Sequence, residues 1–437
     1  MLYNPAIETM PLPQLRALQN ERLRNLVERI YRQIPWYRNQ FDALNIAPKD
    51  IRTVEDLHKL PFTYKTDLRD NYPFGLLATP RTELVRIHAS SGTTGKPTVV
   101  GYTQADIDLF SEVVARSLAA AGGKPGMILH NAYGYGLFTG GLGLHYGGEK
   151  LGMTVVPVSG GMTDRQLLLL CDFGAEMICC TPSYAQTLAE EVAKRGLDLA
   201  EFNLRYAVLG AEPWTETMRT YVEQGLGVRA TNIYGLSEII GPGVSQEDVD
   251  ERGSGSYIWE DHFFPEVVDK DSGEPLSEGK EGVLVFTTLT KAAMPLLRYW
   301  TNDICSLHYD RGGKRTHIKM SPIMGRSDDM LIIRGVNLFH TQVEALISDI
   351  PELSAHYQLV VTRTGTLDEV EVKVEIAESH QQVMNPHDGD PRDQLAVHLQ
   401  RKIKDNIGIS MRVKLHAVGE IPRSEGGKLK RILDLRG

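Results

Sequence analysis

At 437 residues the chain is too long for a small disulfide-stapled scaffold, and 42% hydrophobic with 24% charged residues excludes a disordered or collagen-like protein. The 47 Lys and Arg against 56 Asp and Glu give a net charge of −9, which argues against a surface built to bind nucleic acid. The 4 cysteines show no C-x-x-C spacing and the first residues do not resemble a secretory signal, so we expect a cytoplasmic protein. No run of about 18 uncharged apolar residues occurs, so we expect no membrane-spanning helix.

The predicted elements begin with a helix and continue as alternating strands and helices. Apolar residues at three- and four-residue steps predict a helix over residues 15–30, which Pro35 would end. Residues 84–88 are a candidate strand ahead of a loop rich in Gly, Ser and Thr. Between residues 154 and 224, short apolar strands alternate with amphipathic helices. This pattern predicts a mostly parallel sheet covered on both faces.

Two later changes of pattern indicate further parts. Between residues 260 and 288, turns marked by Gly and Pro separate short strands, which predicts a small antiparallel or barrel-like subdomain. After residue 325, half-buried strand patterns accompany one helical face at residues 395–407. We therefore expect an α/β protein with two domains, residues 1–325 and residues 326–437, the second of α+β type.

A dense cluster of glycines and hydroxyl side chains follows the first candidate strand. It consists of Ser90, Ser91, Gly92, Thr93, Thr94, Gly95 and Lys96. Glycine allows close backbone approach, so N–H groups, hydroxyls and one ammonium can face phosphate oxygens. Only two residues separate the glycines and Pro97 stops a helix, which excludes the P-loop of a kinase or GTPase. The alternatives are a polyphosphate site, which we favour, and an exposed turn.

This loop resembles the phosphate-binding signature of the adenylate-forming superfamily, which includes acyl- and aryl-CoA ligases. Four later segments resemble the superfamily's other motifs in the same order: YGLSE at 234–238, YWTND at 299–303, GRSDD at 325–329 and PRSEGGK at 422–428. Further blocks resemble the short phenylacetate-CoA ligase branch: 88–91, 133–141, 210–214, 259–263 and 327–337. The resemblance covers nearly the whole chain. It implies a large N-terminal adenylation domain and a small mobile C-terminal domain that carries a catalytic lysine.

The resemblance also implies roles for single residues. The catalytic residues would be Lys428, Glu238 and Arg326: Lys428 would act at the α-phosphorus, Glu238 would be a ligand of Mg²⁺, and Arg326 would contact the ribose or phosphate region. Asp303 would accept both ribose hydroxyls, because its two oxygens match a vicinal diol. Asp328 would be the hinge between the two domains.

Each of these assignments has a plainer alternative. Glu238 alone would be a solvated carboxylate at a helix start, and Asp303 a turn residue after Asn302. Arg326 could form an ordinary surface ion pair with Asp329. Two glycines precede Lys428 where the family has one, which leaves Lys430 as a rival for the catalytic ammonium.

The resemblance divides the remaining candidates between two sites. Besides the loop, the expected ATP-binding residues are Gly210, Ala211, Glu212, Pro213, Asn232, Ile233, Tyr234, Gly235, Ser237, Asp303 and Arg326. The expected substrate-binding residues are Tyr133, Tyr135, Gly136, Phe138, Gly210, Gly241 and Pro242. Flat aromatic walls beside glycine favour a planar apolar acid, although aromatic residues in such segments also serve as plain packing.

Histidine and cysteine give weaker signals. Cys179 and Cys180 fit buried apolar filling, and His88 either orients the loop or is a structural histidine. No zinc pattern is present in the sequence, although a metal assembled from distant residues such as His262 stays open.

Together these features predict an AMP-forming ligase that uses ATP, Mg²⁺ and coenzyme A to convert a small aromatic carboxylic acid, phenylacetate first, to its CoA thioester. The resemblance also implies a homodimer. One alternative is a stand-alone enzyme that adenylates an aromatic acid and loads it onto a carrier protein. Another is a nucleotide-binding regulatory protein without catalysis.

Overall fold

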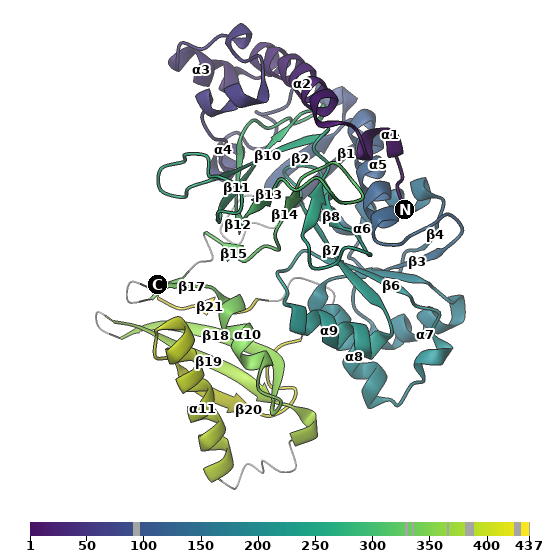
Figure 1. Cartoon of the computed structure of the whole chain (residues 1–437), viewed down its shortest axis with the longest axis vertical. Coiled ribbons are helices and arrows are strands. Elements are labelled where there is room, and N and C mark those ends of the chain that lie inside the picture. The colour runs from purple at the N-terminus through teal and green to yellow at the C-terminus, as the bar shows by residue number, and fades with distance from the viewer. Residues whose placement is uncertain are drawn as a thin grey trace. The chain divides into compact units, whose positions relative to one another are not determined.

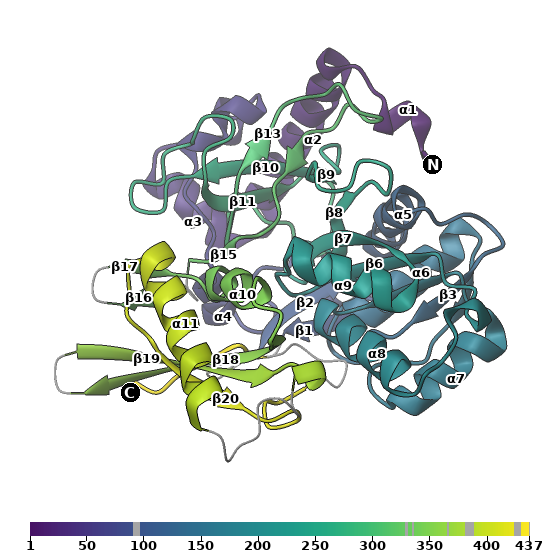
Figure 2. The same cartoon turned by 60° about the horizontal axis from the view of Figure 1, so that its bottom comes forward.

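The structure is a computed structural model that describes residues 1–90, 97–327, 331–333, 336–364, 367–380, 389–423 and 430–436 (Figures 1 and 2). It divides into two compact units. Unit 1 comprises Met1–Cys180, Asp198–Ala211 and Gly227–Ile323. Unit 2 comprises Thr181–Leu197, Glu212–Leu226 and Met324–Gly437. The division into domains at residues 325 and 326 stays a prediction.

Unit 1 begins with helices that cover its core. They are α1 (Pro5–Glu8), α2 (Leu12–Gln33), α3 (Pro35–Ala43) and α4 (Lys65–Asp70), with short 3₁₀ turns η1 (Pro48–Asp50), η2 (Val54–Lys59) and η3 (Arg81–Glu83). The buried side of α2 includes Leu15, Leu23 and Ile30, so the predicted helix over residues 15–30 is confirmed. Pro35 occupies the first position of α3, where its missing N–H has no helical partner to lose.

The central element of unit 1 is a nine-stranded sheet in the order β13-β14-β9-β8-β7-β6-β5-β3-β4. Its parallel strands are β3 (Ile128–Asn131), β4 (Thr154–Val156), β5 (Met177–Cys180), β6 (Tyr206–Gly210) and β7 (Arg229–Leu236). Antiparallel pairing adds β8 (Gly241–Glu247), β9 (Ser256–Ile258), β13 (Leu307–His308) and β14 (Lys319–Met320). Every residue of β5 is buried, as expected for an inner parallel strand. The sheet is therefore mixed: the parallel part predicted between residues 154 and 224 is present, and antiparallel strands from later in the chain extend it.

Helices α5 (Gln104–Ala120), α6 (Gly140–Leu151) and α7 (Thr163–Phe173) belong to the same unit, and α5 packs on α6 and β8. A separate antiparallel sheet contains β10 (Phe263–Val268), β11 (Gly282–Thr288) and β12 (Tyr299–Cys305). The small antiparallel subdomain predicted after residue 260 is thus confirmed. Strands β1 (Arg86–Ser90) and β2 (Thr98–Tyr102) form a hairpin whose connecting residues, 91–96, lie outside the described residues.

Unit 2 contains the helices α8 (Pro182–Lys194) and α9 (Glu216–Leu226). The 3₁₀ turn η4 (Leu199–Glu201), which lies between them in the sequence, belongs to unit 1. The remaining elements of unit 2 are β15 (Gly325–Arg326), β16 (Leu331–Ile333), β17 (Val336–Leu338), α10 (His340–Ser348), β18 (Leu353–Thr364), β19 (Leu367–Ile376), η5 (Glu378–His380), α11 (Gly389–Ile407), β20 (Arg412–His416) and β21 (Ile432–Asp434). Four of its strands form a sheet in the order β20-β19-β18-β21. The predicted helical face is confirmed because Leu395, Leu399 and Ile403 are buried on α11.

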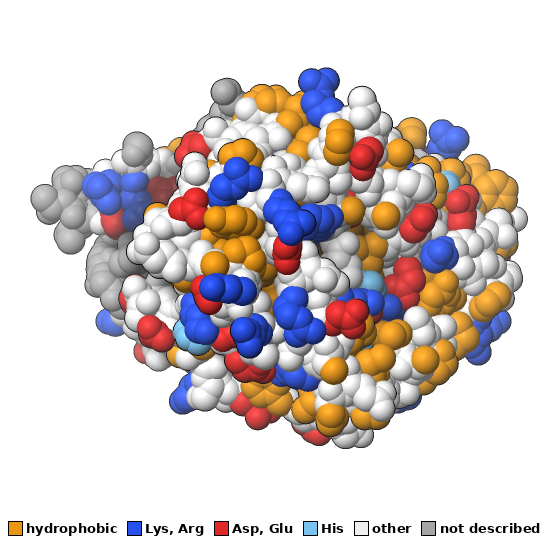
Figure 3. All heavy atoms as spheres, turned by 90° about the horizontal axis from the view of Figure 1, so that it is seen from above, with side chains coloured by type: hydrophobic (Ala, Val, Ile, Leu, Met, Phe, Trp, Pro, Cys, Tyr) orange, Lys and Arg blue, Asp and Glu red, His pale blue; other side chains and the backbone are white. Residues whose placement is uncertain are grey.

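The sequence predicts no membrane-spanning helix and no surface built to bind nucleic acid, and two observations concern these expectations. None of the helices in the described part of the chain combines the length and the apolar character that a bilayer span requires. On the face drawn in Figure 3, basic side chains lie beside acidic and apolar ones, so this face carries both signs of charge.

Candidate active site

Tyr234 and Asp303 meet at the ends of two strands from different sheets. The Tyr234 hydroxyl donates a 2.6 Å hydrogen bond to Oδ2 of Asp303. The N–H of Asp303 donates to the Thr301 hydroxyl at 3.0 Å, and that hydroxyl donates to the Leu284 carbonyl. The ring of Tyr234 stacks on Phe286 with centroids 6.3 Å apart. Two of the residues expected at the nucleotide are therefore in contact, and the carboxylate is held in one orientation.

Glycines allow β6, β7 and β8 to approach closely beside this pair. A Cβ on Gly235 would lie 1.9 Å from the carbonyl oxygen of Gly241, and the pairing of β7 with β8 shifts between Tyr234 and Gly235. A Cβ on Gly210 would lie 2.2 Å from the carbonyl oxygen of Ile233. No larger residue fits at either position without a backbone shift. The glycine requirement here is steric, whereas Ala211 follows with a left-handed φ of 72°.

Glu238 lies in the turn after β7 and is buried, with 6% of its surface exposed. The Lys65 ammonium lies 3.4 Å from Oε1 of Glu238, and the Lys291 ammonium donates a 2.8 Å hydrogen bond to the Glu238 carbonyl. The hydroxyls of Ser237 and Thr139 are 3.1 Å apart. Burial lowers the pKa of Lys291 to about 8. The Glu238 turn is thus fixed through both its main chain and its side chain.

The surroundings of Glu238 fit a magnesium ion that is bound mainly by the phosphates of a nucleotide. Mg²⁺ is usually bound by one or two protein carboxylates together with substrate phosphates, and Glu238 supplies one buried carboxylate. Within the described residues, no group of three or more His, Cys, Asp and Glu side chains could hold a metal by itself.

Sequence reasoning missed Lys65 and Lys291. Neither lysine belongs to a recognisable motif, and neither is near Glu238 in the sequence. The one signal that could have drawn attention to Lys291 is a charged residue directly before the apolar run Ala292 to Leu297.

Four of the expected substrate residues, Tyr133, Tyr135, Gly136 and Phe138, lie between β3 and α6. Tyr133 is buried, whereas the Tyr135 hydroxyl accepts a 2.8 Å hydrogen bond from the Asn131 side chain and contacts His145 Nδ1 at 3.1 Å. Burial raises the pKa of Tyr135 to about 12. Gly136 and Phe138 are exposed, the latter with 47% of its surface.

The aromatic ring of Phe110 packs closely against Gly241. A Cβ on Gly241 would lie 2.4 Å from Cζ of Phe110 on α5, and one on Gly143 would lie 2.3 Å from the same atom. Pro242 lies opposite Gly235 in the β7–β8 pairing. These glycines therefore serve helix and strand packing on that side.

The other candidates fall into three groups. Asn232 donates its main-chain N–H to Glu247 of β8, and Ser90 pairs with Thr98 at the end of β1. Glu212, Pro213 and Arg326 belong to unit 2, where Glu212 accepts a hydrogen bond from the Ser183 N–H at 3.2 Å. Outside the described residues lie Ser91, Gly92, Thr93, Thr94, Gly95, Lys96, Asp328 and Lys428.

His88 connects β1 to the substrate segment. Its Nδ1 lies 2.9 Å from the carbonyl oxygen of Leu137, which also accepts the Ala89 N–H. Burial lowers the pKa of His88, so the ring is neutral at pH 7. Cys179 and Cys180 are fully buried, which confirms their assignment as apolar filling.

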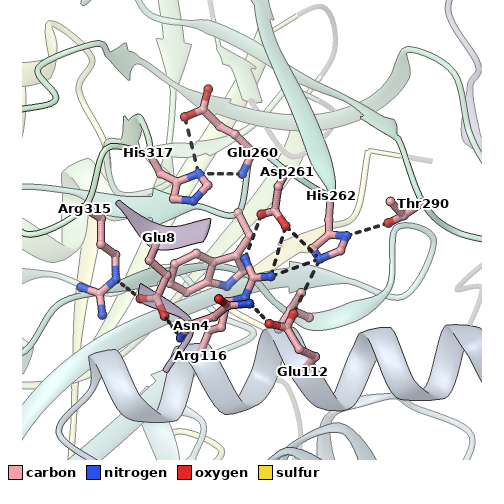
Figure 4. A network of polar contacts seen from close by, with 12 residues as sticks. Asn4, Glu8, Glu112, Arg116, Glu260, Asp261, His262, Thr290, Arg315 and His317 are labelled. Atoms are coloured by element: carbon pink, nitrogen blue, oxygen red, sulfur yellow. Dashed lines mark hydrogen bonds and ion pairs between the residues drawn. The ribbon is translucent and has the colours of Figure 1, made fainter. Parts of the chain in front are cut away.

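His262 belongs to a buried network of ion pairs (Figure 4). Its Nε2 lies 3.0 Å from Asp261, and its Nδ1 lies 2.8 Å from the Thr290 hydroxyl. The Arg116 guanidinium makes two hydrogen bonds to Asp261, at 2.8 and 3.1 Å. Although burial opposes it, the nearby positive charges keep the pKa of Asp261 well below its usual range. The block at 259–263 thus contributes to the core of unit 1.

Comparisons with known proteins show the family to which the chain belongs. A family model described as AMP-binding enzyme matches residues 45–292, and one described as AMP-binding enzyme C-terminal domain matches residues 335–436. The chain therefore belongs to the AMP-binding enzyme family, and the resemblance seen in its motifs is confirmed.

Two curated proteins and one crystal structure illustrate what the chain is similar to. The chain is 64% identical to a phenylacetate-coenzyme A ligase of Thermus thermophilus, with 100% of both chains covered. It is 52% identical to a phenylacetate-coenzyme A ligase of Escherichia coli, with 98% of this chain and 97% of that one covered. A crystal structure of 2-hydroxyisobutyryl-CoA ligase in the postadenylation state, in complex with 2-HIB-AMP, is 25% identical with a TM-score of 0.92, covering 100% of this chain and 92% of that one.

Proposed function

We propose that the chain is a phenylacetate-CoA ligase that forms AMP. In the first step a phenylacetate carboxylate oxygen attacks the α-phosphorus of ATP, and the bond to pyrophosphate breaks. In the second step the sulfur of CoA attacks the acyl carbon, the bond to AMP breaks and the thiol loses its proton. The observation that carries the proposal is 64% identity, over the full length of both chains, to a protein named for this activity.

The site chemistry supports the first step. Asp303, oriented by the hydrogen bond from Tyr234, would accept the two vicinal ribose hydroxyls with its two carboxylate oxygens. Glu238 would hold Mg²⁺ together with the phosphates, and the ion when bound supplies positive charge beside them. We assign the remaining phosphate contacts to the loop at residues 90–96 and to Arg326.

We assign charge stabilisation at the α-phosphorus to Lys428. Cationic groups aimed at the position where negative charge develops contribute strongly to such reactions. Asp328 would be the hinge about which the C-terminal domain rotates, so that different residues serve the two steps. We also propose a cytoplasmic homodimer, as the resemblance implies.

We propose that the acid binds beside the aromatic side chains of residues 133–138. Buried Tyr133 and the partly buried ring of Tyr135 offer flat apolar surface, which suits an aryl group. Gly210, at the end of β6, would border this space and the nucleotide site.

A panel of aromatic acids tests the proposed function. AMP release is measured with ATP, Mg²⁺ and each acid, with and without CoA, and ranked by kcat/KM. We expect release that depends on CoA, with phenylacetate preferred over benzoate by about tenfold or more, because one methylene in an apolar pocket changes binding by about 1–3 kcal/mol. Adenylate formation without any response to CoA would favour the enzyme that loads a carrier protein. Nucleotide binding without turnover would favour the regulatory protein.

A further inference from the structure

The main chain just before Lys65 is hydrogen-bonded to the start of β12, the strand that carries Asp303. Two residues earlier, the Thr63 N–H donates to the Arg298 carbonyl at 3.0 Å, and the Trp300 N–H donates to the Thr63 carbonyl at 2.9 Å. The Thr63 hydroxyl also donates to the Leu297 carbonyl at 2.7 Å. This pairing fixes the start of α4, where Lys65 is the first residue, against the strand that carries the proposed ribose contact.

The Lys65 side chain reaches from this position to the carboxylate of Glu238. Its ammonium lies 3.4 Å from Oε1, and 31% of the lysine side chain is exposed against 6% of the glutamate side chain. An ion pair with one partner buried interacts more strongly than a surface pair, because solvent screens it less. The contact is therefore more than an incidental pair on the surface.

A second lysine holds the same turn in a different way. The Lys291 ammonium is fully buried, donates to the Glu238 carbonyl at 2.8 Å and lies 5.3 Å from the centroid of the Tyr102 ring. The Tyr102 hydroxyl donates to the Ile240 carbonyl at 2.9 Å. Lys291 and Tyr102 thus fix the main chain of the turn, whereas Lys65 faces its carboxylate.

The charge of Glu238 presents a problem for the proposed first step. A buried carboxylate repels the triphosphate of ATP unless a cation stands between them or beside them. We propose that Lys65 is a positioning residue that neutralises Glu238 while no divalent cation is bound, so that the nucleotide can approach before the metal does. Lys65 and Mg²⁺ would then perform the same task at one carboxylate. This inference rests on the proposed function, which makes Glu238 the metal ligand.

The proposed role of Lys65 is tested by calorimetry, which measures how tightly the full chain binds a β,γ-imido analogue of ATP. The analogue is not hydrolysed, so binding is measured without catalysis. In Lys65→Met we expect the metal-free affinity to fall about tenfold, because Glu238 is left uncompensated, but to fall by less than about threefold at saturating Mg²⁺. In the double variant Lys65→Met/Glu238→Gln the metal-free affinity should return to within about threefold of the wild type. Lys59→Met is the matched control, because Lys59 pairs with Asp56 on the surface at 2.6 Å; its affinity should not change.

The outcomes separate this inference from the proposed function. An equal loss in Lys65→Met with and without Mg²⁺, no loss at all, or no recovery in the double variant would overturn the role of Lys65. Absence of analogue binding to the wild-type chain would instead overturn the proposed function. Circular dichroism of each variant confirms folding, and the recovery in the double variant shows that loss in the single variant is not a folding defect.

Discussion

At the scale of single residues, the sequence motifs predicted that Tyr234 and Asp303 lie close together, but they did not predict the two lysines beside Glu238. Tyr234 and Asp303 are 69 residues apart, and their motifs alone placed both at one nucleotide; the structure brings them to 2.6 Å. Lys65 and Lys291 could not be found in this way. An ion pair between Lys65 and Glu238 depends on how distant segments pack, and a single sequence carries no record of such a contact.

The hydrogen bond between Tyr234 and Asp303 predicts a specific kinetic effect. Tyr234→Phe removes the donor that orients the carboxylate, and hydrogen bonds to charged groups contribute about 1.5–3 kcal/mol. We expect KM for ATP to rise about tenfold or more while kcat changes little. Steady-state kinetics with ATP as the varied substrate measures this, and Tyr309→Phe, on an exposed side chain, is the control. An unchanged KM in Tyr234→Phe would show that the hydrogen bond does not orient the ribose contact.

At the scale of elements, apolar strands were predicted better than polar ones. Strand β5 is fully buried and β6 is buried from its second residue on, and both lie in the segment 154–224 where the sequence predicts short apolar strands. Strand β7 was not predicted, because Thr231 and Asn232 interrupt its apolar pattern. The Thr231 hydroxyl donates to the Ala207 carbonyl, which allows a polar residue inside the sheet. The sharp shift in pairing at Gly235 also depends on contacts with β8 that the sequence does not display.

The close approach of β7 and β8 predicts that Gly235→Ala is disruptive. The added Cβ would meet a main-chain oxygen at 1.9 Å, so the two strands must move apart. We expect a loss of about 1–3 kcal/mol in the free energy of unfolding, measured by urea denaturation, and weaker ATP binding because Glu238 follows three residues later. Gly134→Ala is the control, since a Cβ there meets nothing within 4 Å. Equal stability of the two variants would contradict the packing argument.

At the scale of the whole molecule, changes of pattern along the chain predict the fold. They do not predict the roles that we propose for Lys428 and Asp328. The parallel sheet, the antiparallel subdomain and the α+β unit were each predicted from periodicity and turn residues. Lys428 and Asp328 rest on motif resemblance, because both lie outside the described residues. Their roles require two arrangements of one chain, and a pattern of residues encodes packing within a unit more directly than motion between units.

The most direct test of the account separates its two chemical steps in Lys428→Ala, with Lys430→Ala as the matched control. Phenylacetate-dependent exchange of pyrophosphate with ATP, without CoA, measures the first step, and thioester formation from supplied phenylacetyl-adenylate and CoA measures the second. The account predicts that Lys428→Ala lowers exchange by about a hundredfold or more and leaves thioester formation within about threefold of the wild type, with both steps nearly unchanged in Lys430→Ala. Equal loss of both steps in Lys428→Ala, or a loss of exchange in Lys430→Ala alone, would contradict it.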